Sequence, residues 1–161
     1  MIIDPNNFMI KTGVRTFEAA AFLRRNGAAV TRVRKLFRED AQGSKAKADA
    51  VSQAEIYKQC FAVSICTADE LPNPTVIGAQ AANELLNIKG IKASFVLTDY
   101  QGKIYISARS IDEVNVQIIA ERLGGGGHIN AAGAQFDHTD IQAAIARLKD
   151  TIDQMIEAGD I

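Results

Sequence analysis

Four consecutive glycines, Gly124–Gly127, constrain this sequence more than any other feature. Glycine loses the most backbone entropy on folding, so a run of four is unfavourable unless the fold needs it. The run is followed by His128 and an apolar segment at residues 129–133, whereas flexible linkers usually have polar flanks. Glycines let backbone amides approach an anion, and a helix beginning near His128 would add its positive end. The pattern predicts a phosphate-binding loop, with a plain tight turn as the alternative.

The apolar pattern from position 60 onward predicts an α/β fold with the element order βαββαβα. We expect a small mixed β-sheet flanked by helices, because short strands alternate with amphipathic helices. Residues 99–102, Asp-Tyr-Gln-Gly, are typical of a hairpin turn between two strands. The expected strands span residues 60–66, 94–98, 103–109 and 134–136, and the expected helices span 75–87, 115–123 and 139–158.

The part of the chain before position 60 has a different pattern. It predicts helices at residues 16–25, from residue 31, and at 44–57. The third helix is alanine-rich and only weakly amphipathic, which favours a connector between units over a core element. Residues 1–60 carry a net charge of +5 and the remainder −6, within a total of −1. This split indicates two units with different neighbours, or else charges that only decorate solvated helices.

Composition excludes several classes of protein. The 161 residues are 47% hydrophobic and 23% charged, which argues against wholesale disorder. The sequence has no apolar run of about 18 residues and no secretory signal, so a cytoplasmic location without membrane contact is expected. Cys60 and Cys66 lie too far apart on one predicted strand for a disulfide, so free thiols are expected. Two such cysteines and two histidines cannot assemble a Cys/His metal cluster.

Three further residues are candidates for a site. Arg109 ends a predicted strand, where an arginine is unfavourable unless it pairs with an anion, and the alternative is a surface arginine paired with Asp112 or Glu113. Asn115 is expected to cap the helix that follows, with a ligand contact as the alternative. Asp4 follows an apolar strand, a position that suits a metal-ligating carboxylate as well as an ordinary turn.

Several motifs resemble those of a known family. The segment from Gly124 to Gly133, together with residues 106–110 and 114–116, resembles the DHH-associated domain of DHH-family phosphoesterases. Residues 3–8, 11–20 and 57–63 are similar to the GdpP-type cyclic-di-AMP phosphodiesterases within that family. The resemblance covers nearly the whole chain.

This resemblance implies a division of the chain. Residues 1–42 would be the carboxyl-terminal tail of the catalytic DHH domain, 43–58 a connecting helix, and 59–161 the complete DHH-associated substrate-binding domain. The family's catalytic domain holds two Mn²⁺ ions, and Asp4 matches its last metal-ligating aspartate. The Asp-His-His triplet is absent from this sequence, so this chain is not expected to bind both ions or to be active alone. The resemblance places nucleotide binding on Arg109, Asn115, Gly124, Gly125, Gly126, Gly127 and His128.

The implied function is hydrolysis of cyclic-di-AMP to pApA by a parent enzyme, with this piece binding the nucleotide. Its expected partners are a cyclic dinucleotide or short oligoribonucleotide, the missing part of the DHH domain, and a second copy if it forms a homodimer. Upstream helices outside this sequence would anchor the parent protein in the membrane. The alternatives are part of an oligoribonuclease or 3′-phosphoadenosine phosphate phosphatase, and a noncatalytic nucleic-acid-binding module. The last has little support because aromatic residues make up only 6% of the chain.

Overall fold

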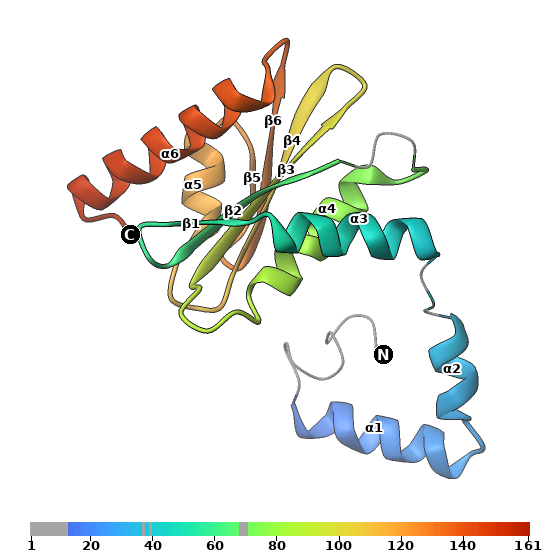
Figure 1. Ribbon diagram of the computed structural model, residues 1–161. Coiled ribbons are helices and arrows are strands. Elements are labelled where there is room, and N and C mark those ends of the chain that lie inside the picture. The colour runs from blue at the N-terminus through green and yellow to red at the C-terminus, as the bar shows by residue number, and fades with distance from the viewer. Residues whose placement is uncertain (1–12, 37, 39, 68–70) are drawn as a thin grey trace. The chain divides into compact units, whose positions relative to one another are not determined.

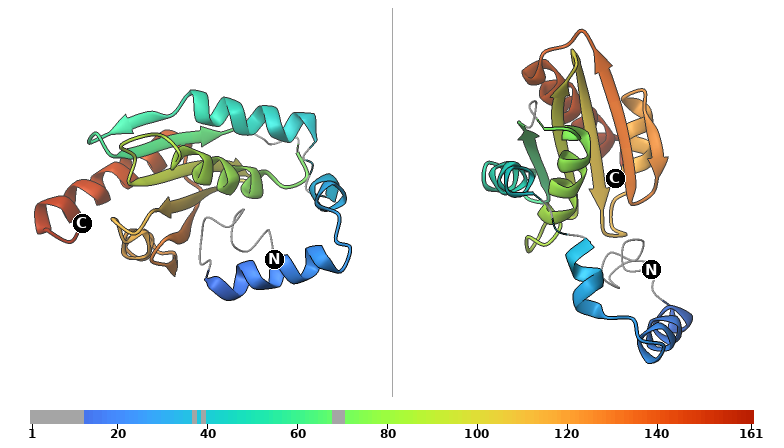
Figure 2. Two further views of the ribbon diagram at one scale, coloured as in Figure 1. Left: turned by 90° about the horizontal axis from the view of Figure 1, so that it is seen from below. Right: turned by 90° about the vertical axis from the view of Figure 1, so that its right-hand side faces the viewer.

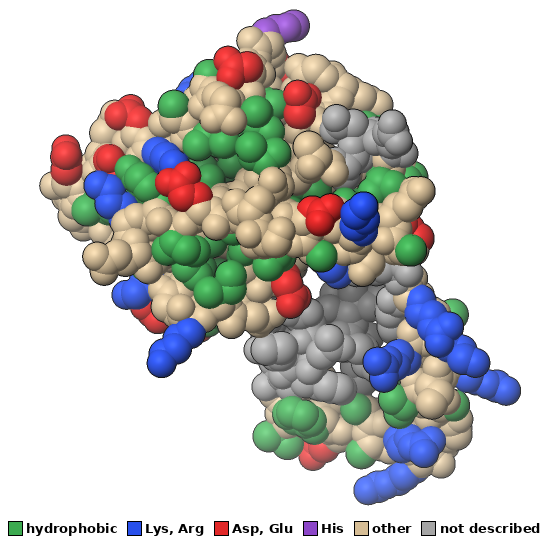
Figure 3. Space-filling model, viewed as in Figure 1, with side chains coloured by type: hydrophobic (Ala, Val, Ile, Leu, Met, Phe, Trp, Pro, Cys, Tyr) green, Lys and Arg blue, Asp and Glu red, His purple; other side chains and the backbone are tan. Residues whose placement is uncertain are grey.

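The computed structural model describes residues 13–36, 38, 40–67 and 71–161 (Figure 1). The chain divides into two compact units, Met1–Glu39 and Asp40–Ile161. In the first unit, α1 (Val14–Arg25) and α2 (Val30–Leu36) are joined by a turn in which Gly27 has a φ of 90°. Lys and Arg side chains gather over these helices, as the charge split indicates (Figure 3).

The second unit is built on a six-stranded sheet with the order β1-β2-β3-β4-β6-β5. Strands β2 and β3 are parallel and every other neighbouring pair is antiparallel, so the sheet is mixed, as predicted. The strands are β1 (Glu55–Tyr57), β2 (Phe61–Cys66), β3 (Ala93–Tyr100), β4 (Lys103–Ser110), β5 (Gly126–His128) and β6 (Ala131–Asp137).

Helices cover the two faces of this sheet in pairs (Figure 2). On one face lie α3 (Ala41–Ser52) and α4 (Pro74–Leu85), which pack through alanines and Leu85 onto Ala62 and Val96. On the other face lie α5 (Val116–Arg122) and α6 (Ile141–Ala158), which bury the larger core around Phe95. The expected α/β fold is confirmed.

The predicted hairpin turn is also confirmed. Strands β3 and β4 are joined by Gln101 and Gly102, whose φ angles are 53° and 75°. Two consecutive positive φ angles define the type I′ turn that matches the twist of an antiparallel pair. Glycine adopts this conformation without strain, which explains why the turn ends on Gly102.

The predicted bounds of the helix at residues 44–57 are wrong. It ends at Ser52, and β1 follows it and pairs with β2. Ala50 is fully buried, and the Ser64 hydroxyl on β2 donates to the Ala50 carbonyl oxygen. The small side chains let α3 approach the sheet closely, so weak amphipathy here marks tight packing against the core.

The expected thiols are confirmed, since half-buried Cys60 and buried Cys66 form no disulfide. In the part of the chain that the structure describes, no helix combines the length and apolar character needed to cross a membrane.

Candidate functional site

The glycine run forms the end of one helix and the start of an edge strand. Gly124 follows α5 with a φ of 84°, and the amide of Gly125 donates to the Ala120 carbonyl oxygen at 2.8 Å, which closes the last turn of the helix. The chain then continues as β5 and turns at residues 129–130 into β6. The helix expected to begin near His128 is therefore wrong, and its positive end does not contribute to a site.

The four glycines have different structural roles. A Cβ on Gly125 would lie 2.0 Å from the Gly133 carbonyl oxygen, and one on Gly127 would lie 2.5 Å from the Ala132 Cα. These two positions need glycine because β5 approaches β6 so closely. Gly126 meets nothing within 4 Å and its φ is not positive. No neighbouring atom requires glycine at position 126. The absence of a side chain there leaves the surface beside β5 open.

The strand register places two of the predicted site residues, Arg109 and His128, on one face of the sheet. Arg109 on β4 pairs with Ala131 on β6, and Ala131 pairs with His128 on β5. Paired residues of neighbouring strands point to the same face, and strands are about 4.8 Å apart. Arg109 and His128 therefore flank Ala131 with their Cα atoms roughly 10 Å apart.

The next row along the strands consists of small residues. Ser107, Gly133 and Gly126 are in register on β4, β6 and β5. Among the described residues no helix covers β6 and β5 on that side, and the outward residues of β6 are exposed or half-buried. We call this surface of β4, β6 and β5 the open face.

Arg109 has the environment of an anion-binding residue. Its guanidinium is half-buried, and burial lowers its pKa below the usual value. One nitrogen, Nη1, donates to the carbonyl oxygens of Ala108 at 2.8 Å and Ala132 at 3.5 Å. Among the described residues no carboxylate pairs with it. A desolvated cation with free donors is suited to a bidentate contact with phosphate.

The surface alternative for Arg109 is not observed. Asp112 accepts a hydrogen bond from the Asn130 amide at 2.6 Å, and Glu113 pairs with Lys92 at 2.8 Å. Both acids that could have neutralised the arginine have other partners.

Asn115 and His128 have different surroundings. The Asn115 side chain accepts from the Gln117 amide at 3.0 Å and so caps α5, as expected. This bond uses one lone pair of the side-chain oxygen and leaves the N–H donors of Asn115, from which a phosphate would accept, outside the cap. His128 is exposed and belongs to the open face by register.

Two polar residues on the open face were missed by the sequence interpretation. Tyr105 on β4 and Gln135 on β6 are paired in register, two residues beyond the small row. Tyr105 is half-buried and Gln135 exposed, and the described residues give neither side chain a hydrogen-bond partner. If the strand predicted at 134–136 is extended back to Ala131, the alternation of side chains puts Gln135 on the same face as Ala131.

A metal centre is not formed by the described residues. They contain no group of three His, Cys, Asp or Glu side chains arranged to hold an ion, and Asp4 lies outside the described residues. This donor set does not fit a site for two Mn²⁺ ions.

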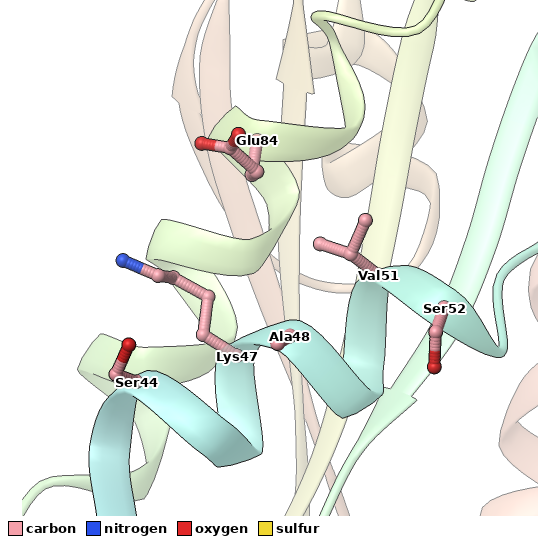
Figure 4. A pocket seen from close by; sticks show the side chains of 6 residues that line it. All are labelled: Ser44, Lys47, Ala48, Val51, Ser52 and Glu84. Atoms are coloured by element: carbon pink, nitrogen blue, oxygen red, sulfur yellow. The ribbon is translucent and has the colours of Figure 1, made fainter. Parts of the chain in front are cut away.

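A shallow hollow elsewhere contains none of the predicted site residues. It lies between α3 and α4, where Ser44, Lys47 and Glu84 contribute polar groups beside Ala48 and Val51 (Figure 4). Its opposite charges and aliphatic floor give it no clear selectivity for a ligand.

Comparisons with known proteins match this chain over nearly its whole length. Residues 58–157 match the model of the DHHA1 domain. The cyclic-di-AMP phosphodiesterase GdpP of Geobacillus thermodenitrificans is 38% identical over 160 residues, which cover 99% of this chain and 24% of that protein. The cyclic-di-AMP phosphodiesterase PdeA of Listeria monocytogenes is 40% identical over 95% of this chain and 23% of that protein. The chain thus spans about a quarter of these curated relatives.

A solved structure shares the fold. An exopolyphosphatase-related protein from Bacteroides fragilis superposes with a TM-score of 0.82 at 19% identity. The match covers 96% of this chain and 48% of that protein.

Proposed function

This chain belongs to the DHHA1-domain family, and we propose that it is the nucleotide-binding part of a phosphodiesterase that hydrolyses cyclic-di-AMP to pApA. It is similar to part of a DHH-family phosphodiesterase, which agrees with the resemblance that its motifs indicated. On this proposal the chain forms the carboxyl-terminal part of the enzyme, and further domains supply the catalytic centre.

The observation that supports this proposal is the row that joins Arg109 to His128 across the open face. A phosphate above Ala131 would accept hydrogen bonds from the unused guanidinium donors of Arg109 on one side. It would lie beside the imidazole of His128 on the other. The missing side chain at Gly126 leaves room for the sugar next to the phosphate. These residues bind and orient the nucleotide and take no part in bond cleavage.

The metal chemistry belongs to the rest of the enzyme on this proposal. Two Mn²⁺ ions would activate water for attack on phosphorus. Because the described residues do not fit such a centre, we assign this chain no catalytic step. We further propose that it lies in the cytoplasm and that upstream helices anchor the parent protein.

Titration calorimetry tests the proposal. The purified chain should bind cyclic-di-AMP or pApA, and Arg109→Ala should weaken that binding about 10-fold or more, since a hydrogen bond to a charged group is worth about 1.5–3 kcal/mol. Arg109→Lys should recover only part of the affinity, because lysine lacks the bidentate geometry.

Arg147→Ala is the matched control. Arg147 also contacts its neighbours through its guanidinium, stacking over the Phe136 ring at 4.6 Å, but it lies on α6, across the sheet from the open face. Equal binding by wild type and Arg109→Ala would refute the proposed site. Sustained Mn²⁺-dependent hydrolysis by the purified chain would refute the proposal that its catalytic centre is incomplete. Tighter binding of a short oligonucleotide than of either dinucleotide would favour an oligoribonuclease.

A further inference from the structure

The open face is arranged in four rows of different chemistry. The first row has Arg109 and His128, and the second has the small residues Ser107, Gly133 and Gly126. The third has Tyr105 and Gln135. The fourth is closed by an ion pair between Lys103 and Asp137 at 3.1 Å, so its charges already have partners.

The side chains with unused hydrogen-bonding groups thus lie at the two ends of a small, flat floor. Arg109 and Tyr105 are four residues apart on β4, a distance of about 13 Å along the strand. The side chains of Arg109 and Gln135 can lean over the floor and shorten the gap. Buried Ser94 and Thr98 on β3 mark where α4 covers the sheet, so this helix forms a wall on one side. The dimensions suit a ligand with a phosphate at one end and a flat polar group at the other.

We propose that Tyr105 and Gln135 form a subsite for an adenine base, an inference that rests on the proposed nucleotide binding. A tyrosine ring offers a stacking surface that any base can use. A glutamine amide matches the edge of adenine, because its carbonyl oxygen accepts from N6 while its amide donates to N7. Guanine presents two acceptors at the same positions, O6 and N7, so the glutamine oxygen would face an acceptor. Gln135 therefore selects adenine, and Tyr105 adds affinity without selecting.

The two residues are suited to this role by their surroundings. Gln135 is exposed and Tyr105 is half-buried, and neither donates to nor accepts from another described side chain. Their pairing in register keeps the ring and the amide side by side. A dinucleotide would place one phosphate in the first row and the adjoining base in the third.

The experiment compares linear dinucleotides of adenosine and of guanosine by calorimetry on the full 161-residue chain. Wild type should prefer the adenosine dinucleotide roughly 5- to 140-fold, the range expected of one bidentate base contact. Gln135→Leu should bring this ratio close to 1. Gln142→Leu, at an exposed position on α6, is the matched control and should keep the wild-type ratio.

Two more variants separate this inference from the proposed function. Tyr105→Leu should weaken both dinucleotides to a similar degree, and Arg109→Ala should weaken both and preserve their ratio. If Arg109→Ala weakens binding while Gln135→Leu leaves the ratio unchanged, the base subsite is wrong and the phosphate site stands. If the wild-type chain binds neither dinucleotide, both proposals fail.

Discussion

Replacing Gly125 with alanine tests whether close strand contact explains the glycine run. The new Cβ would lie 2.0 Å from the Gly133 carbonyl oxygen and 2.6 Å from the Ala134 Cα. Both neighbours are backbone atoms in a paired strand, so neither can rotate away. Gly126→Ala is the matched control, because its Cβ meets nothing within 4 Å and its φ is not positive.

The size of the effect follows from this geometry. To reach the 3.4 Å of ordinary contact, the Gly133 oxygen must retreat by 1.4 Å. A ladder hydrogen bond of about 2.9 Å does not survive that shift, and each is worth about 1 kcal/mol. We expect Gly125→Ala to lower the free energy of unfolding by about 2–3 kcal/mol, in the range of overpacked positions. If only β5 detaches from the sheet, the loss of unfolding free energy is smaller. Gly126→Ala should leave the free energy of unfolding unchanged or raise it by about 0.5 kcal/mol.

Urea denaturation followed by circular dichroism measures both variants, and hydrogen exchange at residues 126–128 shows whether β5 has detached from β6. A Gly125→Ala protein as stable as Gly126→Ala, with β5 still protected, would refute the close-contact argument. Gly126→Ala also separates folding from binding: on the proposed function it weakens nucleotide binding while the fold remains intact.

Two further predictions concern other parts of the fold. The hydrogen bond from Tyr57 to Asp153 raises the pKa of Tyr57 to about 12. Since an unfolded tyrosine titrates near 10, this stabilisation is complete below about pH 10 and is lost as the pH rises towards 12. The melting temperature of Tyr57→Phe should decline less than that of the wild type between about pH 10 and 12. An identical decline in both proteins would contradict this prediction. Asp140 caps α6 by accepting from the backbone amides of Gln142 and Ala143. Asp140→Ala should therefore lower the free energy of unfolding in urea by about 1 kcal/mol. An equal loss in Asp140→Asn would argue against the cap.

Local patterns predicted most elements of the second unit, because its strands and helices have regular periodicity and strong turn residues. The hairpin at Gln101–Gly102 is specified by residues next to each other in sequence. The sequence interpretation failed where tertiary contact decides. The apolar segment at residues 129–133 is helical by composition, yet it forms a turn and the start of β6 because β4 and β5 pair with it on both sides.

The candidate site also depends on tertiary contacts that local sequence patterns do not predict. Arg109 and His128 were identified separately, one as an arginine at a strand end and the other as the first side chain after the glycines. Their juxtaposition depends on the order β4-β6-β5, which reverses the sequence order of the last two strands. The role of Asp4 and the division of the chain at residues 42 and 58 stay predictions, and Asp4 lies outside the described residues.

The two outermost strands of the sheet limit how this unit can associate. Both β1 and β5 are three residues long, so each edge presents only a few backbone groups to a newcomer. At the β1 edge, Lys149 forms an ion pair with Glu55 at 2.7 Å, which places charge where an added strand would have to lie. Short, charged edges oppose growth of a sheet from one molecule into the next. A homodimer of this unit would accordingly form through its helices or through the open face, and edges this short also oppose fibrous aggregation.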